Sequence, residues 1–144
     1  MTRTRILTIA LSAALLIGPT MTTAQASTWR DAECRYQYVD GHRNWTVTEV
    51  KATIVCAAAK FHVSVLTAFY VADRESRFRQ YARNAYSGAA GIYQHLPVYW
   101  PARYAAFAGG HRKLLPAGSS AYNARSNVLV ALWMAQTSWA PWGM

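Results

Sequence analysis

The sequence contains no Asp and no Glu after Glu75, so the chain from Ser76 to Met144 has no acidic side chain. A soluble domain usually distributes carboxylates over its whole surface. The entire chain has six acidic residues against 15 Lys and Arg. Chemistry that needs a carboxylate must therefore use Glu75 or one of the earlier acids, which are Asp31, Glu33, Asp40, Glu49 and Asp73.

Several familiar catalytic signatures are also missing. The sequence has no G-x-S-x-G element, no Walker phosphate loop and no Cys and His pair that suggests a dyad. These absences argue against a serine hydrolase, a nucleoside triphosphatase and a cysteine peptidase. We expect no metal and no cofactor, because the histidines are isolated from one another. They are His42, His62, His95 and His111.

The first 26 residues have the features of a signal peptide. Arg3 and Arg5 precede an apolar run from Ile6 to Ile17, and Ala24-Gln25-Ala26 supplies the small residues of a cleavage site. The run is nearer to signal-peptide length than to spanning length, although an uncleaved membrane anchor is the alternative. We therefore expect residues 1–26 to be removed and the mature, extracellular chain to begin at Ser27.

The mature chain is strongly basic. Removal of residues 1–26 leaves 13 Lys and Arg against six acids, which is a formal charge of +7. A secreted protein of this charge is attracted to anionic surfaces such as a cell wall, nucleic acid or acidic lipid. The alternative is that the charge serves only solubility.

The chain has two cysteines, Cys34 and Cys56. In the oxidising compartment that export implies, such a pair is expected to form a disulfide. This bond would tie an N-terminal arm, residues 27–45, to the first helix. The alternative is a Cys and His metal site, which lacks a second ligand at metal-site spacing.

Capping signals mark three helices. Thr46 and Glu49 stand in a capping-box relation before apolar residues at helical spacing. Ser64 can cap a second helix, which then has Glu75 in its last turn. Ser126 can cap a final helix over residues 128–136, and the apolar residues on all its sides predict that it is buried in the middle of the domain.

Helical periodicity is lost between Arg77 and Gln94. Gly88 and Gly91 suit a backbone that turns tightly or approaches another group closely. Pro97 and Pro101 fit the starts of helices.

Glu75 is suited to act as a general acid. The helix dipole and apolar neighbours favour its protonated form, whereas nearby arginines favour the charged form. Most glycosidases need a second carboxylate. Asp73 lies about 200° away around the helix, and the acids before Glu49 could help only if the arm folded over the site. The residues therefore favour a reaction in which the substrate supplies the missing group, and the alternative is an ordinary helix-end glutamate paired with an arginine.

Three motifs in order resemble the soluble lytic transglycosylase family of the lysozyme-like superfamily. They are Glu75-Ser76-Arg77-Phe78, Ala82-Arg83-Asn84, and Ser87 to Gln94 (SGAAGIYQ) with Leu96-Pro97. The family shows E-S-x-F, then A-x-S or A-x-N, then G-A-x-G-x-x-Q and a Pro. Asn127-Val128 resemble its Asn-Ile at the start of a buried helix, and the segment 139–142 is similar to the Trp-rich end of short secreted actinobacterial members. A lookalike of a later family motif, residues 121–125, precedes Asn127, so we assign it no role.

The resemblance implies a mainly helical, α+β lysozyme-like domain over residues 46–144, in which a short β-like GAAGIYQ segment lines the cleft. It also implies a lytic transglycosylase that cleaves the MurNAc-GlcNAc β-1,4 bond of peptidoglycan with Glu75 as acid/base. To the substrate-binding residues that it suggests we add His95, beside Gln94, and Tyr99, one of several aromatic residues that could stack on sugars. The full set is Ser87, Gly91, Ile92, Tyr93, Gln94, His95, Tyr99 and Asn127.

This interpretation makes peptidoglycan glycan strands the partner of a monomeric, wall-associated protein. It involves no nucleic acid and, after signal cleavage, no membrane. The alternatives are a lysozyme-type hydrolase of the same bond, a non-catalytic wall-binding domain, and a basic protein that binds nucleic acid or anionic membrane.

Overall fold

The computed structural model describes residues 44–115 and 120–144. In these residues the chain forms four α-helices and two short 3-10 helices. The elements are α2 (Val47–Phe61), α3 (Val65–Ser76), α4 (Trp100–His111), η1 (Arg112–Leu114), α5 (Ala124–Ala135) and η2 (Ala140–Trp142). No strand occurs in this part of the chain, which has only isolated antiparallel bridges. The prediction of a mainly helical domain is therefore confirmed.

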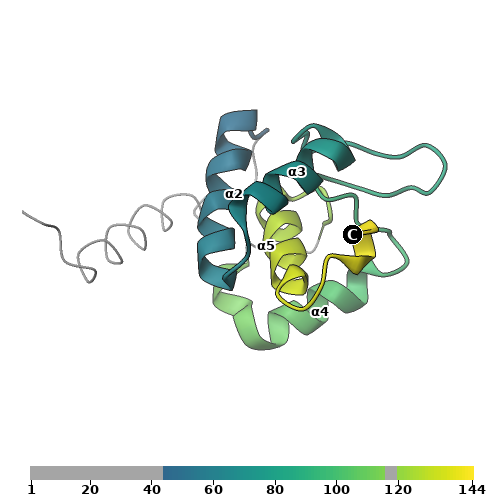
Figure 1. Cartoon of the computed structure of the whole chain (residues 1–144). Coiled ribbons are helices and arrows are strands. Elements are labelled where there is room, and N and C mark those ends of the chain that lie inside the picture. Colours follow the sequence, from purple (N-terminus) through teal and green to yellow (C-terminus); the bar gives the residue numbers. More distant parts are fainter. Residues whose placement is uncertain (1–43, 116–119) are drawn as a thin grey trace, which may run out of the picture.

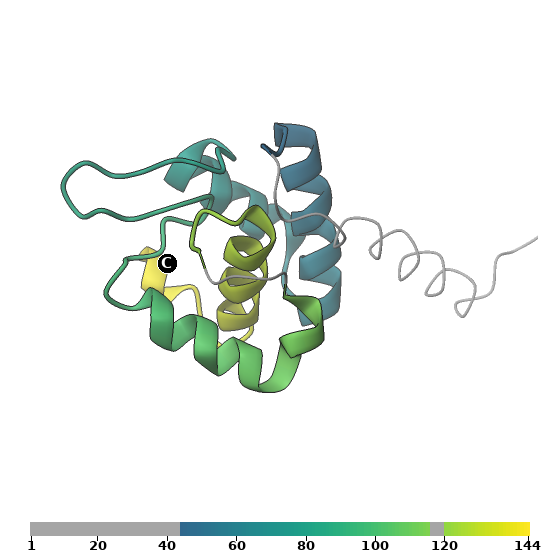
Figure 2. The same cartoon turned by 180° about the vertical axis from the view of Figure 1, so that it is seen from behind.

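Helix α5 forms the centre of the core. It lies between α2 and α4, as seen from both sides in Figures 1 and 2. Every residue from Ala124 to Leu132 is buried, and the side chains of Val128, Leu129 and Leu132 expose no surface. A helix that is apolar on all sides is stable only where other elements surround it. The predicted burial of this helix is confirmed.

Side-chain caps fix the starts of the first two described helices. At α2, the Glu49 backbone N–H donates to Thr46 Oγ1 over 3.3 Å, and the Thr46 N–H donates to the Glu49 carboxylate over 2.8 Å. At α3, the Thr67 N–H donates to Ser64 Oγ over 3.3 Å. Both predicted caps are confirmed, and Glu75 lies in the last turn of α3 as expected.

The predicted start of α5 is wrong by one turn. The helix begins at Ala124, and its N-cap is Asn123, whose Oδ1 accepts from the Ser126 N–H over 3.0 Å. The Ser126 hydroxyl is buried and has no hydrogen-bond partner in the described part of the chain. Two good N-cap residues stand three positions apart here, and the structure uses the first.

The prolines before α4 differ in their roles. Pro101 lies in the first turn of α4, as predicted. Pro97 instead lies in the turn before the helix, in which the Tyr99 and Trp100 N–H groups both donate to the Leu96 carbonyl over 3.0 Å. Pro97 therefore does not start a helix.

A long loop projects from the helices between α3 and α4 (Figures 1 and 2). Within this loop, Ala90 forms two isolated antiparallel β-bridges, one with Arg83 and one with His95. The side chain of Asn127 fastens this loop to α5: its Oδ1 accepts from the Tyr93 N–H over 2.8 Å, and its Nδ2 donates to the Ala90 and Ala121 carbonyls over 3.1 and 2.7 Å. This amide is therefore one of the contacts that attach the loop to the centre of the core.

Several sequence predictions fall outside the described residues. The signal peptide lies there, as does the arm up to residue 43, which includes Cys34. Cys56 is buried in α2 and is not a free thiol, and its disulfide with Cys34 stays a prediction. None of the helices described by the structure is long and apolar enough to cross a membrane.

We expect Gly91→Ala to be strongly destabilising. Gly91 has a φ of +78°, and a Cβ there would lie 2.3 Å from Asn127 Nδ2 and 2.4 Å from the Ala121 carbonyl oxygen. The substitution should lower the free energy of unfolding in guanidinium by about 2 kcal/mol or more. Gly109→Ala is the matched control, because a Cβ at Gly109 in α4 meets nothing within 4 Å. Equal stability of the two variants would contradict the packing described.

Candidate active site

Glu75 lies at the surface end of α3. The helix stops after Ser76 because Arg77 adopts a left-handed conformation, with a φ of 54°. Ala68, Val71 and Ala72 form the buried side of the helix, and the Glu75 side chain is 24% exposed. The carboxyl group can therefore meet a ligand from solvent while its backbone is fixed in a packed helix.

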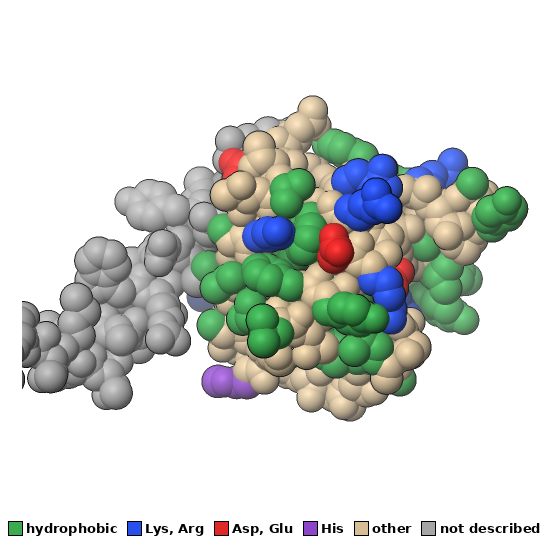
Figure 3. Space-filling view, turned by 45° about the horizontal axis from the view of Figure 1, so that its top comes forward, with side chains coloured by type: hydrophobic (Ala, Val, Ile, Leu, Met, Phe, Trp, Pro, Cys, Tyr) green, Lys and Arg blue, Asp and Glu red, His purple; other side chains and the backbone are tan. Residues whose placement is uncertain are grey.

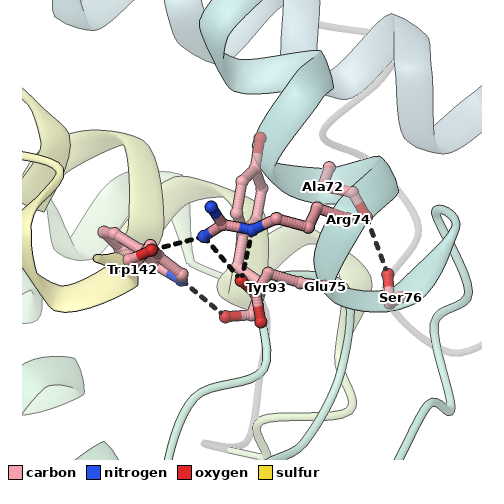
Figure 4. Close-up of polar contacts among 6 residues, drawn as sticks. All are labelled: Ala72, Arg74, Glu75, Ser76, Tyr93 and Trp142. Carbon is pink, nitrogen blue, oxygen red and sulfur yellow. Dashed lines mark hydrogen bonds and ion pairs between the residues drawn. The ribbon is translucent and has the colours of Figure 1, made fainter. Parts of the chain in front are cut away.

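Arg74 binds one oxygen of this carboxyl group. Its Nε and Nη2 donate to Glu75 Oε1 over 3.2 and 2.9 Å, and this hydrogen bond is the main cause that raises the pKa of Arg74. The same guanidinium donates to the Trp142 carbonyl (Figure 4). No hydrogen bond from the described residues reaches Glu75 Oε2. One carboxyl oxygen is thus held, and the other is available.

Besides Glu75, the described residues include two acidic side chains, Glu49 and Asp73. Glu49 belongs to the capping box at the start of α2, where it binds Thr46. Asp73 is exposed and, two positions before Glu75 in the same helix, points about 200° away from it. The remaining acids, Asp31, Glu33 and Asp40, lie outside the described residues.

Tyr93 connects α3 to the C-terminal segment beneath Glu75. Its hydroxyl donates to the Ala68 carbonyl over 2.9 Å, and its carbonyl accepts from Trp142 Nε1 over 2.8 Å (Figure 4). The rings of Tyr93 and Trp142 meet edge to face, with centroids 6.1 Å apart. Burial raises the pKa of the Tyr93 phenol, which stays neutral. Tyr93 thus joins α3 to the C-terminal segment and offers no surface to a ligand.

His95 is buried in its neutral form. Arg103 Nη1 lies 3.3 Å from His95 Nδ1, and His95 Nε2 lies 3.2 Å from the Asn127 carbonyl oxygen. Because guanidinium can only donate, Nδ1 accepts and Nε2 carries the proton that binds Asn127. Burial lowers the pKa of His95 to about 4. This histidine therefore links the loop, α4 and α5.

The predicted substrate-binding residues fall into two groups. The side chains of Ile92, Tyr93, His95 and Asn127 expose no surface, and Gly91 is packed against Asn127. In the structure these five residues set the shape and position of the loop.

The other predicted residues reach the surface. Ser87 is exposed, Gln94 is half-buried and Tyr99 is 53% exposed with Arg103 over its ring at 5.3 Å. The Gln94 amide is partly committed, since its Nε2 donates to the Gly91 and Ala82 carbonyls over 2.8 and 3.1 Å. Ser87, Tyr99 and part of Gln94 are therefore accessible to a ligand from solvent.

Sequence reasoning gave no role to Gln80. Its Oε1 accepts from the Trp45 N–H over 2.8 Å, and its Nε2 donates to the Tyr122 carbonyl over 3.0 Å. These partners lie 35 and 42 positions away, so no local pattern marks the residue. The sequence predicted Trp142 only as part of the Trp-rich C-terminal segment. Its hydrogen bonds to Tyr93 and Arg74 join segments that are distant in sequence.

Two of the hollows lined by described residues have similar volumes. One, of about 400 Å³, lies between the start of α2 and the segment after α3. The other, of about 350 Å³, lies at the end of α5 beside Trp133 and Pro141. Glu75 lines neither. No group of His, Cys, Asp and Glu side chains in the described ranges could hold a metal ion.

Comparisons of this chain with protein-family models, with curated proteins and with solved structures found no match.

We expect His95 to make stability depend on pH. Its pKa falls from an ordinary value of 6.5 to about 4 in the folded protein, so the unfolded chain binds the extra proton between these values. The free energy of unfolding should therefore decrease as the pH falls from about 6.5 to about 4, by up to about 3 kcal/mol. Denaturant unfolding at several pH values should show a smaller decrease in His95→Gln. An identical pH dependence in both proteins would contradict the buried neutral imidazole.

Proposed function

We propose that this protein is a secreted, wall-associated lytic transglycosylase with a lysozyme-like domain. Its substrate would be the MurNAc-GlcNAc β-1,4 bond in the glycan strands of peptidoglycan. The observation that supports this most is the isolation of Glu75, a part-exposed carboxyl group with one oxygen available and no described carboxyl partner. The ordered motifs from Glu75 to Pro97 support the substrate class. We further propose that it acts as a monomer and without a cofactor.

The first step would be proton transfer from Glu75. Arg74 binds Oε1, so Oε2 is the oxygen that can carry the proton and deliver it to the glycosidic oxygen. The bond from the MurNAc anomeric carbon to this oxygen breaks, and the departing GlcNAc keeps the proton. The substrate's own N-acetyl oxygen attacks the anomeric carbon in place of an enzyme carboxylate.

The second step would return the proton to Glu75. The carboxylate removes the proton from the 6-hydroxyl of the same MurNAc, and the resulting oxygen attacks the anomeric carbon and releases the N-acetyl oxygen. The products are a 1,6-anhydro end and regenerated Glu75, and no water is consumed. Between the steps the Arg74 guanidinium would stabilise the ionised carboxylate.

Glu75→Gln should abolish this activity. The amide keeps the shape of the side chain but cannot exchange the proton, so release of muropeptides from purified sacculi should fall by a factor of about 100 or more. Asp73→Asn is the matched control, since it removes the same charge from an exposed position in the same helix. The control should keep its activity, and both variants should melt close to the parent protein. Activity retained by Glu75→Gln would refute the assignment.

The product should distinguish the transglycosylase from a hydrolase. Attack by the 6-hydroxyl gives muropeptides with 1,6-anhydro ends, each one water lighter than the product of hydrolysis. We expect mass spectrometry of digested sacculi to find the anhydro form as the main new end. Reducing ends alone would mean a lysozyme-type reaction and a second carboxylate, such as Asp31, Glu33 or Asp40.

A non-catalytic wall-binding domain is the second candidate. One observation favours it, namely that Arg74 is paired with Glu75. Such a domain would sediment with sacculi and release no muropeptides. The release of muropeptides by the unsubstituted protein, measured in the Glu75→Gln experiment, therefore distinguishes the two functions.

A further inference from the structure

The larger hollow is a groove formed by the start of α2 and the segment directly after α3. Its walls combine aromatic and cationic side chains, and its volume is about 400 Å³. The lining residues that matter here are Trp45, Phe78, Arg79, Gln80, Tyr81 and Arg83. The groove begins just beyond the turn that ends the helix of Glu75.

The floor of this groove is fixed before any ligand binds. Gln80 is buried and joins the backbone of Trp45 to that of Tyr122 through both ends of its amide. The ring of Phe78 is also buried, and Lys51 Nζ lies 4.6 Å from its centroid. Tyr81 is 58% exposed and stands at the rim. A ligand would therefore enter a groove that needs little rearrangement.

Two arginines of the groove have guanidinium groups that no carboxylate of the described residues neutralises. Arg79 uses its Nε to bind the Ser76 carbonyl over 2.9 Å, which leaves its terminal nitrogens available. The exposed side chain of Arg83 makes no hydrogen bond or ion pair with a described residue. Figure 3 shows Lys and Arg side chains spread among hydrophobic ones on one face of the molecule.

We propose that this groove binds an acidic peptide chain. The terminal nitrogens of Arg79 and Arg83 would each bind a carboxylate, for which the guanidinium fork is well suited. The exposed ring of Tyr81 would cover an apolar part of the peptide. A polyphosphate has charge but no apolar surface, so it would gain nothing from this ring. This inference rests on the proposed function, under which the ligand is the acidic peptide that branches from the glycan strand cut at Glu75.

Calorimetric titration of the full-length mature protein can test the groove directly. The probes are a short synthetic peptide with two carboxylates and the same peptide with both carboxylates amidated. We expect the acidic peptide to bind and Arg83→Gln to weaken binding roughly tenfold, as expected for one charge-assisted contact. Arg83→Lys should recover part of the affinity, because it restores the charge without the fork.

Arg112→Gln is the control, because it removes the same charge from an exposed position outside the groove. It should bind the acidic peptide as the parent protein does. Equal binding of the two peptides, or equal affinities of Arg83→Gln and Arg112→Gln, would overturn the proposal. Tighter binding of inorganic polyphosphate than of the acidic peptide would overturn the choice of a peptide.

The titration is repeated with Glu75→Gln, so that its outcome does not depend on cleavage. Peptide binding without any cleavage of sacculi by the parent protein would refute the proposed enzyme and support the groove. Cleavage without peptide binding would refute the groove and leave the enzyme. If the protein both binds the peptide and cleaves sacculi, Arg83→Gln should slow cleavage of peptide-bearing glycan more than cleavage of glycan stripped of its peptides.

Discussion

The buried amide of Asn127 is the contact on which the candidate site depends. It lies in the central helix and binds three backbone groups, and its side chain exposes no surface. A buried amide that loses such partners is costly, so this loop conformation is strongly favoured over others. From Asn127 the connection runs through Tyr93 to Trp142, and from the Trp142 carbonyl to Arg74 and Glu75. The position of one surface carboxyl group is therefore set from the core.

The scarcity of acidic residues gives the two proposed sites their character. Arg74 has a carboxylate partner in Glu75, whereas Arg79 and Arg83 have none among the described residues. The excess of basic over acidic residues thus leaves Glu75 without a second carboxylate for catalysis. It also leaves several cationic side chains available to an anionic ligand. A polymer with a neutral sugar backbone and acidic branches matches both features. The glycan and the peptide would then be recognised by separate parts of the molecule, the glycan at Glu75 and the peptide in the groove after α3.

Most local signals in the sequence predicted the structure correctly, whereas contacts between distant segments gave no signal. The caps at Thr46 and Ser64 and the burial of α5 follow from residues close in sequence, so the helical fold was predictable. The start of α5 was missed because Asn123 and Ser126 both suit an N-cap. Most motif residues after Gly91 turned out to be buried, since a motif records which residues occur together and not which of them face solvent. Gln80 gave no signal because its partners are distant in sequence.

The position of α5 along the chain also affects how the protein folds. The central helix comes after α2 and α4, the helices that it contacts, so a chain emerging from its N-terminus lacks its core until α5 is made. Its contacts with α2 span most of the domain, and such long-range contacts form slowly. A nascent chain would therefore remain open for longer than one whose core forms early. An open chain is the form that a protein-export channel can thread, which suits the secretion proposed here.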